Sequence, residues 1–169
     1  MLEPWQTRRM RTRDEQRTVI KADQQFWRDL AADVGPGRYN EPGAMGEWTF
    51  GDLAGHLLGW RNRTISRLEA AARGEPDPIA FQPGTDAEFD AANVEIREAH
   101  AGRAAGELVD AYTESYDRLI RALDALPEEL LRDGGAFPWS EGQALIDVTF
   151  TGHLHEEHVP GVRAWLDRD

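Results

Sequence analysis

Three of the five histidines in this 169-residue chain fall within six residues near its C-terminus, at His153, His155 and His158. Glu156 and Glu157 lie between them. Imidazoles and carboxylates are common protein ligands of zinc, and imidazole also suits nickel and iron. The chain has no cysteine, so a metal site cannot use thiolates. This stretch therefore has the composition of a histidine and carboxylate metal site.

The spacing of the three histidines decides which of them face inward. On a regular helix turning about 100° per residue, His153 and His158 flank the apolar side, whereas His155 points away from it. His153 and His158 are five residues apart, however, and ligands on one helical face are normally three or four apart. Pro160 lacks an N–H group and crowds the preceding turn, so a kink or π-bulge there would bring this pair nearly into line. We therefore rank His153 and His158 ahead of the alternative pair, His155 and His158.

A third ligand candidate is His56, which lies one helical turn before Trp60. Asp52, one turn earlier on the same side, is expected to orient the His56 ring. Three histidines with an open fourth position are typical of a catalytic site for zinc or nickel. A metal there would lower the pKa of a bound water or thiol, with Glu157 assisting proton transfer. Trp60 is a candidate for the wall of a cofactor-binding pocket.

Amphipathic segments must position these residues, because apolar residues recur at intervals of three, four and seven. The main helices are expected at 13–34, 49–73, 104–126 and from 140 to the C-terminal region, with a short extra helix at 85–100. Thr49 and Asp52 form a capping-box signal, and Ser140 with Glu141 is a second N-cap signal. No strand-like alternation is present. The sequence therefore predicts an all-α four-helix bundle with a long crossover at 74–84.

Composition and charge exclude several classes of function. The formal net charge is -12, and an acidic body repels phosphate backbones, so we expect no nucleic-acid partner. No apolar run reaches the roughly 18 residues of a membrane span, and no secretory signal is evident. With no cysteine, a cytoplasmic protein is expected. Residues 1–12 are arginine-rich and are expected to form a disordered basic arm before a single domain at 13–169.

Two stretches resemble motifs of the DinB-like superfamily of metalloenzymes. The second expected helix reads Trp48-Thr-Phe-Gly-Asp-Leu-Ala-Gly-His56-Leu-Leu-Gly-Trp60, and it resembles the family's tryptophan, aspartate, histidine and tryptophan signature. The last reads Gly152-His153-Leu-His155-Glu-Glu-His158 and resembles the final helix of its members, including the ClbS/DfsB-like branch. The resemblance covers nearly the whole chain. It implies a four-helix bundle, commonly a homodimer, in which His56 matches the first metal ligand and His158 the last.

The resemblance also implies a function. Characterised relatives include thiol-dependent transferases and isomerases that use mycothiol, bacillithiol or glutathione, and proteins that hydrolyse or sequester reactive molecules. It thus implies a divalent metal, a low-molecular-weight thiol as cosubstrate, and a small electrophilic or thiol-conjugated metabolite as substrate, with detoxification as a role. The chain departs from the family's His-x-x-x-His spacing, because Leu154 stands four residues before His158. The alternative is a metal-free bundle that binds a hydrophobic small molecule or acts as a dimeric interaction module.

Overall fold

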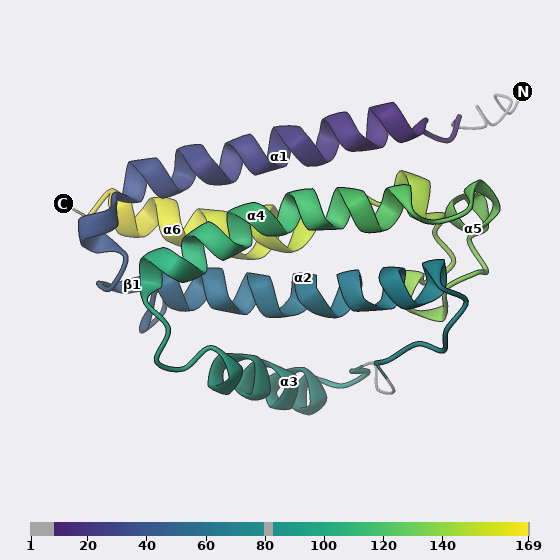
Figure 1. Ribbon diagram of the computed structural model, residues 1–169. Coiled ribbons are helices and arrows are strands. Elements are labelled where there is room, and N and C mark those ends of the chain that lie inside the picture. Colours follow the sequence, from purple (N-terminus) through teal and green to yellow (C-terminus); the bar gives the residue numbers. More distant parts are fainter. Residues whose placement is uncertain (1–8, 80–82, 169) are drawn as a thin grey trace, which may run out of the picture.

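The computed structural model describes residues 9–79 and 83–168 and is mostly helical. Its α-helices are α1 (Arg13–Val34), α2 (Phe50–Ala72), α3 (Asp86–Ala99), α4 (Ala105–Asp124), α5 (Glu128–Arg132) and α6 (Val159–Leu166). The shorter elements are the 3-10 turns η1 (Pro36–Arg38), η2 (Pro138–Ser140) and η3 (Leu145–Asp147), the π-helical η4 (His153–His158), and strands β1 (Pro42–Met45) and β2 (Trp48–Thr49). Helix α4 packs along α1 and α2, and α3 lies on the outer side of α2 (Figure 1).

Three helices begin at capping boxes, which fix their N-terminal ends. In each, a threonine side chain accepts from the backbone three residues later, where an acidic side chain bonds back to the threonine N–H. The pairs are Thr12 with Glu15, Thr49 with Asp52, and Thr85 with Glu88. The predicted start of the second helix is therefore confirmed, and it sets the rotation of α2 that carries His56 inward.

Glycines on α2 allow its neighbours to approach closely. A Cβ added at Gly51 would lie 2.5 Å from the Cβ of Ala105, and one added at Gly59 would lie 2.3 Å from Cγ2 of Ile96. Both distances are shorter than real side chains permit. Helices α3 and α4 can therefore pack against the α2 backbone on either side of His56.

The core between α1, α2 and α4 is aromatic at its centre. Trp27 stacks on Phe50 with ring centroids 4.9 Å apart and meets the edge of Tyr112 at 4.7 Å. All three rings are buried, and aromatic pairs of this kind add to the stability from burial alone. This core is the fixed base against which the candidate site is built.

The prediction of a last helix starting at Ser140 is wrong. Ser140 ends the turn η2, Glu141 has a positive φ of 54°, and helical backbone returns only near Gly152, first as the π-helical η4. Leu145 and Ile146 are fully buried, although they belong to a short 3-10 turn. Apolar residues can be buried in irregular backbone as well as in a helix. Their spacing in the sequence can then resemble the spacing of a helix that does not form.

The expectation of no strands is also wrong. Strands β1 and β2 pair antiparallel, with Pro42 opposite Thr49 and Met45 opposite Trp48. The hairpin is too short to show an alternating pattern in the sequence. It closes the connection between α1 and α2 and packs against α6.

Two further expectations concern the N-terminus and membranes. Most of the expected basic arm, residues 1–12, falls in residues 1–8, which lie outside the described part of the chain. Arg11 donates from its backbone and guanidinium to Asp147, and Thr12 caps α1.

Across residues 9–79 and 83–168, none of the helices is both long and apolar enough to cross a membrane.

Candidate metal centre and adjoining cavity

The structure brings His56 of α2 together with His153 and His158 of η4. Nε2 of His153 lies 3.0 Å from Nε2 of His56 and 3.1 Å from Nε2 of His158. One ligand atom from each of the three residues falls within 4.8 Å of the others. Two nitrogens bound to a tetrahedral zinc ion are about 3.3 Å apart, so small side-chain movements would seat one ion among them. The donor set therefore fits a divalent metal such as zinc or nickel.

The spacing of five residues is possible because η4 is π-helical. The N–H of Val159 bonds to the carbonyl of Leu154, five residues earlier, and Pro160 has no N–H to offer the preceding turn. The extra residue in this turn brings the His153 and His158 rings to a centroid distance of 4.6 Å. Of the kink and the π-bulge that were considered at this proline, the structure shows the π-bulge. Leu154 is instead buried in the core.

Deletion of Glu156 is expected to convert this π turn into a regular α turn and to leave the histidine cluster intact. Glu156 is exposed, and removing one residue inside a π turn preserves the packing of the helix that follows. His153 and His158 would then be four apart on one face. Zinc affinity, measured by competition with a chromophoric chelator, should change by less than about tenfold.

Deletion of Gly161 is the control for this experiment, because it lies beyond the π turn. It should rotate the buried Trp165 by about 100° and destabilise the fold. Loss of zinc binding after deletion of Glu156, in protein that unfolds with the wild-type midpoint, would contradict the role given to the π turn.

The contacts around the cluster orient His153 but not the other two rings. Glu157 Oε2 lies 3.3 Å from Nδ1 of His153, so this carboxylate faces Nδ1 while Nε2 faces the other two imidazoles. Nδ1 of His56 and Nδ1 of His158 are buried and have no hydrogen-bond partner in the described part of the chain. The expectation that Asp52 orients His56 is therefore wrong, because its carboxylate is used in capping α2.

Burial keeps two of the three imidazoles neutral. His56 is 5% exposed and His158 is 8% exposed. Burial, reinforced by the neighbouring imidazoles, lowers the pKa of His56 to about 3. Burial and then His153 lower the pKa of His158 to about 4, against an opposing effect of Glu157. Neutral imidazole is the form that binds metals, so both residues are suited to bind at neutral pH.

The metal-free protein is expected to lose stability as the pH falls from about 6.5 to about 4. Unfolded histidines titrate near pH 6.5, so in this window the unfolded chain binds more protons and the free energy of unfolding rises with pH. One pKa unit corresponds to about 1.4 kcal/mol, and the titrations of the two residues are coupled. Together they should lower the free energy of unfolding by on the order of 3 to 5 kcal/mol. Urea unfolding at pH 7 and pH 4.5 measures this loss. His56→Leu should show a clearly smaller loss, and an equal loss in both proteins would contradict the assignment.

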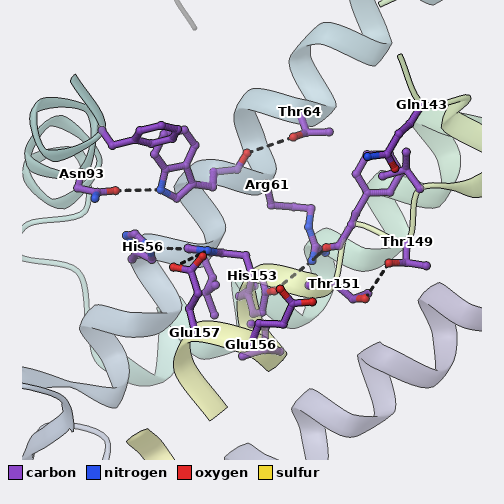
Figure 2. Close-up of a pocket in the computed structure, with 18 of the residues that line it drawn as sticks. His56, Arg61, Thr64, Asn93, Gln143, Thr149, Thr151, His153, Glu156 and Glu157 are labelled. Atoms are coloured by element: carbon purple, nitrogen blue, oxygen red, sulfur yellow. Dashed lines mark hydrogen bonds and ion pairs between the residues drawn. The ribbon is translucent and has the colours of Figure 1, made fainter. Parts of the chain in front are cut away.

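A cavity of about 970 Å³ opens beside the cluster, lined by α2, α3 and the segment from Gln143 to Glu157 (Figure 2). Trp60 lies in its wall, as predicted for a pocket residue, and its Nε1 donates to Asn93 Oδ1 at 3.0 Å. Phe89 lies against the Trp60 ring. Glu157, the predicted proton-transfer residue, also lines the cavity. The cavity is large enough for a small organic ligand.

His155 lies apart from the three clustered histidines. Its Nε2 pairs with Asp23 Oδ1, and its ring contacts Phe26 with centroids 4.5 Å apart. The structure therefore does not place His155 beside His56, and the alternative pair of His155 with His158 is not brought together.

The sequence did not reveal a buried polar network that joins the cavity to α1. Arg61 Nη2 donates to the hydroxyl of Tyr112 at 3.0 Å, the hydroxyls of Tyr112 and Tyr116 are 3.3 Å apart, and Tyr116 donates to Asp23 Oδ2 at 2.7 Å. Tyr112 and Tyr116 lie among the buried residues of α4, so their spacing resembles that of ordinary core residues. Asp23 and Arg61 also fall on the buried stripes of their helices, where a charged residue requires partners. That placement was the signal that could have predicted the network.

Comparison with known proteins identifies the family of the chain. The family model described as the mycothiol maleylpyruvate isomerase N-terminal domain matches residues 20–158, a range that includes all three clustered histidines. No curated protein and no solved structure matches the chain. The matched range spans well over half of the sequence. The chain therefore belongs to the mycothiol maleylpyruvate isomerase N-terminal domain family, which is part of the DinB-like superfamily.

Proposed function

We propose that the protein is a divalent-metal-dependent enzyme that acts on a small electrophilic or thiol-conjugated metabolite. His56, His153 and His158 would hold zinc or nickel. The observation that carries the proposal is the convergence of three imidazole nitrogens beside a cavity of about 970 Å³. The family is described by a mycothiol-dependent isomerase, which supports a low-molecular-weight thiol as cosubstrate. A transferase, isomerase or hydrolase reaction with a role in detoxification is consistent with this arrangement.

Each residue would have a distinct task. The metal, when bound, would lower the pKa of a coordinated water or thiol. Glu157 faces Nδ1 of His153, which would keep Nε2 available, and from the cavity wall it would accept the proton that the thiol releases. Trp60 and Phe89 would exclude water from one side of the reacting group.

Metal analysis of tag-free protein tests this proposal. The wild-type protein is expected to retain stoichiometric zinc or nickel, and His56→Ala is expected to retain little. A chelator-sensitive reaction between a thiol and an electrophilic probe should be found only in the metal-loaded wild type. Sub-stoichiometric metal in both proteins, after incubation with excess zinc and nickel, would rule out the proposal.

The proposal extends to the arrangement and assembly that the family resemblance implies. Helices α1, α2 and α4, with the η4–α6 segment, would be the four members of a DinB-like bundle, which would form a homodimer in the cytoplasm. The fit of the long elements in Figure 1 to such a bundle supports this extension. Light scattering of the purified protein would test the homodimer.

A further inference from the structure

A second, smaller cavity lies on the other side of His56 from the large one. It has a volume of about 240 Å³ and lies between the start of α2 and the connection from α3 to α4 (Figure 1). Its lining includes Asp52, Gly55 and His56 of α2 and residues 100–103 of the connection. At about 100° per residue, Asp52 and Gly55 fall on one side of His56, whereas Trp60 of the large cavity falls on the other. The small cavity is therefore separate from the large one, and the two share His56 as a wall.

The two cavities differ in charge. The small cavity is lined by Arg97 and Arg103 and by a single carboxylate, that of Asp52. One oxygen of this carboxylate already accepts from the backbone N–H and the hydroxyl of Thr49. The large cavity is lined by one arginine and by five carboxylates, those of Asp86, Asp90, Asp147, Glu156 and Glu157. In a metal-free protein with a formal net charge of -12, the small cavity is therefore the more favourable of the two for an anion.

Arg97 is held beside the small cavity by an aromatic contact that leaves its donors free. Its central guanidinium carbon lies 5.1 Å from the ring centroid of Trp48, which also lines the small cavity. The side chain is exposed and forms no hydrogen bond or ion pair with another described residue. An aromatic face attracts the guanidinium without accepting a conventional hydrogen bond from it. Arg97 therefore presents a planar fork of N–H donors, which matches the oxygens of a phosphate group.

His100 supplies a second donor, and Arg103 fixes its tautomer. Nη1 of Arg103 lies 3.3 Å from Nδ1 of His100. A guanidinium can only donate, so Nδ1 accepts and the neutral ring carries its proton on Nε2. Burial and then Arg103 lower the pKa of His100, which keeps the ring neutral at pH 7. Cδ2, the ring atom next to Nε2, lies 3.6 Å from the position of a Cβ at Gly55, in the wall of the small cavity.

Arg103 and Arg97 have different tasks at the small cavity. Nη2 of Arg103 pairs with exposed Glu107 at 3.4 Å, and Nη1 is used on His100. The charge of Arg103 is therefore partly balanced within the chain, and this residue chiefly orients His100. Arg97 has no such carboxylate and is the principal positive charge for a bound anion.

We propose that the small cavity is a phosphate-binding site, in which the guanidinium of Arg97 and Nε2–H of His100 hold the phosphate group. Its volume equals that of roughly eight water molecules in the liquid, which is enough for one phosphate group and its nearest waters. A phosphate group has several acceptor oxygens and can meet both donors at once. The group belongs either to inorganic phosphate or to a phosphorylated metabolite whose remainder extends into solvent. This site does not rest on the proposed function, because neither donor belongs to the histidine cluster.

Titration of metal-free protein with inorganic phosphate, followed by the amide signals of residues 97–103, tests the proposal. The wild type is expected to show saturable shifts with a dissociation constant on the order of 1 mM, as a few charge-assisted hydrogen bonds would give. Arg97→Met keeps an apolar chain against Trp48 but removes the charge, so it should weaken binding at least about tenfold. Arg97→Lys should retain part of the affinity. Absence of saturable shifts in the wild type, or equal affinity in Arg97→Met, would overturn the proposal.

Arg118→Met is the matched control, because it removes one positive charge from another exposed arginine, which donates to Asn62. It should keep the wild-type affinity for phosphate. His158→Ala should keep it as well, since the small cavity does not include that residue. Loss of phosphate binding in His158→Ala but not in Arg97→Met would place the anion at the histidine cluster and refute the proposed site.

Glycerol 3-phosphate identifies the source of the phosphate group. Tighter binding of this ester than of inorganic phosphate would assign the small cavity to a phosphorylated metabolite, and weaker binding would assign it to the free ion. Glycerol itself lacks the charged group and should give no shifts at residues 97–103. Shifts with glycerol as large as those with its phosphate ester would show that the small cavity does not recognise phosphate, which would overturn the proposal.

Discussion

Replacing His158 with alanine is expected to weaken zinc binding by at least about a hundredfold. The side chain is 8% exposed, and its Nε2 lies 3.1 Å from Nε2 of His153, so the substitution removes one of three convergent donors. Two imidazoles alone cannot complete a three-histidine site. Competition with a chromophoric chelator at pH 7 measures the change, and unfolding curves of the metal-free proteins show whether the fold is retained.

His155→Ala is the matched control for this experiment. Like His158→Ala, it removes one imidazole, and the two positions are three residues apart. Nε2 of His155, however, pairs with Asp23 outside the cluster. Zinc affinity should therefore stay within about threefold of the wild type. The reverse result, with zinc lost in His155→Ala and kept in His158→Ala, would assign the site to the other candidate histidine.

The helices α1, α2, α3 and α4 could be predicted closely because their signals are local. Apolar spacing and capping pairs such as Thr49 with Asp52 depend on residues a few positions apart, and they place the ends of α2 within one residue of the prediction. The region from Ser140 to Thr151 could not be predicted in this way. Its conformation depends on positive φ values at Glu141 and Phe150 and on distant partners, among them Gln16, which donates to the carbonyl of Leu145.

The histidines of the candidate site could be chosen from the sequence, whereas the contacts of the residues around them could be predicted less well. The conflict between a five-residue spacing and Pro160 indicated a kink or a π-bulge, and the structure has the π-bulge. On a regular helical wheel Glu157 falls on the apolar side, whereas in the structure it is exposed and pairs with His153. The wheel fails here because the extra residue in the turn changes the rotation of every residue after it. No local pattern links Asp23 to Arg61, since their connection passes through two tyrosines of another helix.

Replacing Asp23 with alanine is expected to lower the free energy of unfolding by about 3 to 5 kcal/mol. Asp23 is 6% exposed and accepts from Tyr116 at 2.7 Å, and it supplies the negative charge that balances buried Arg61 through two hydroxyls. Its removal would leave the Tyr116 hydroxyl with only the weaker acceptor Tyr112, 3.3 Å away, and the guanidinium without a counter-charge. Urea unfolding of the metal-free protein at pH 7 measures this cost. Asp14→Ala, on the exposed face of the same helix, should cost at most about 0.5 kcal/mol although it breaks an ion pair with Arg17.

A double-mutant cycle tests whether this network, rather than local packing, accounts for the cost. Tyr116→Phe alone should cost about 1 to 3 kcal/mol, because Asp23 loses its buried donor. The double variant lacks both the carboxylate and the hydroxyl, so neither is left buried without its partner. Its loss of unfolding free energy should therefore be smaller than the sum of the two single losses by about 0.5 to 3 kcal/mol. Additive costs would show that the two residues act independently. A measured coupling would instead mean that α1 and α4 hold Arg61 of α2 in place, which links the stability of the core to the geometry of the cavity.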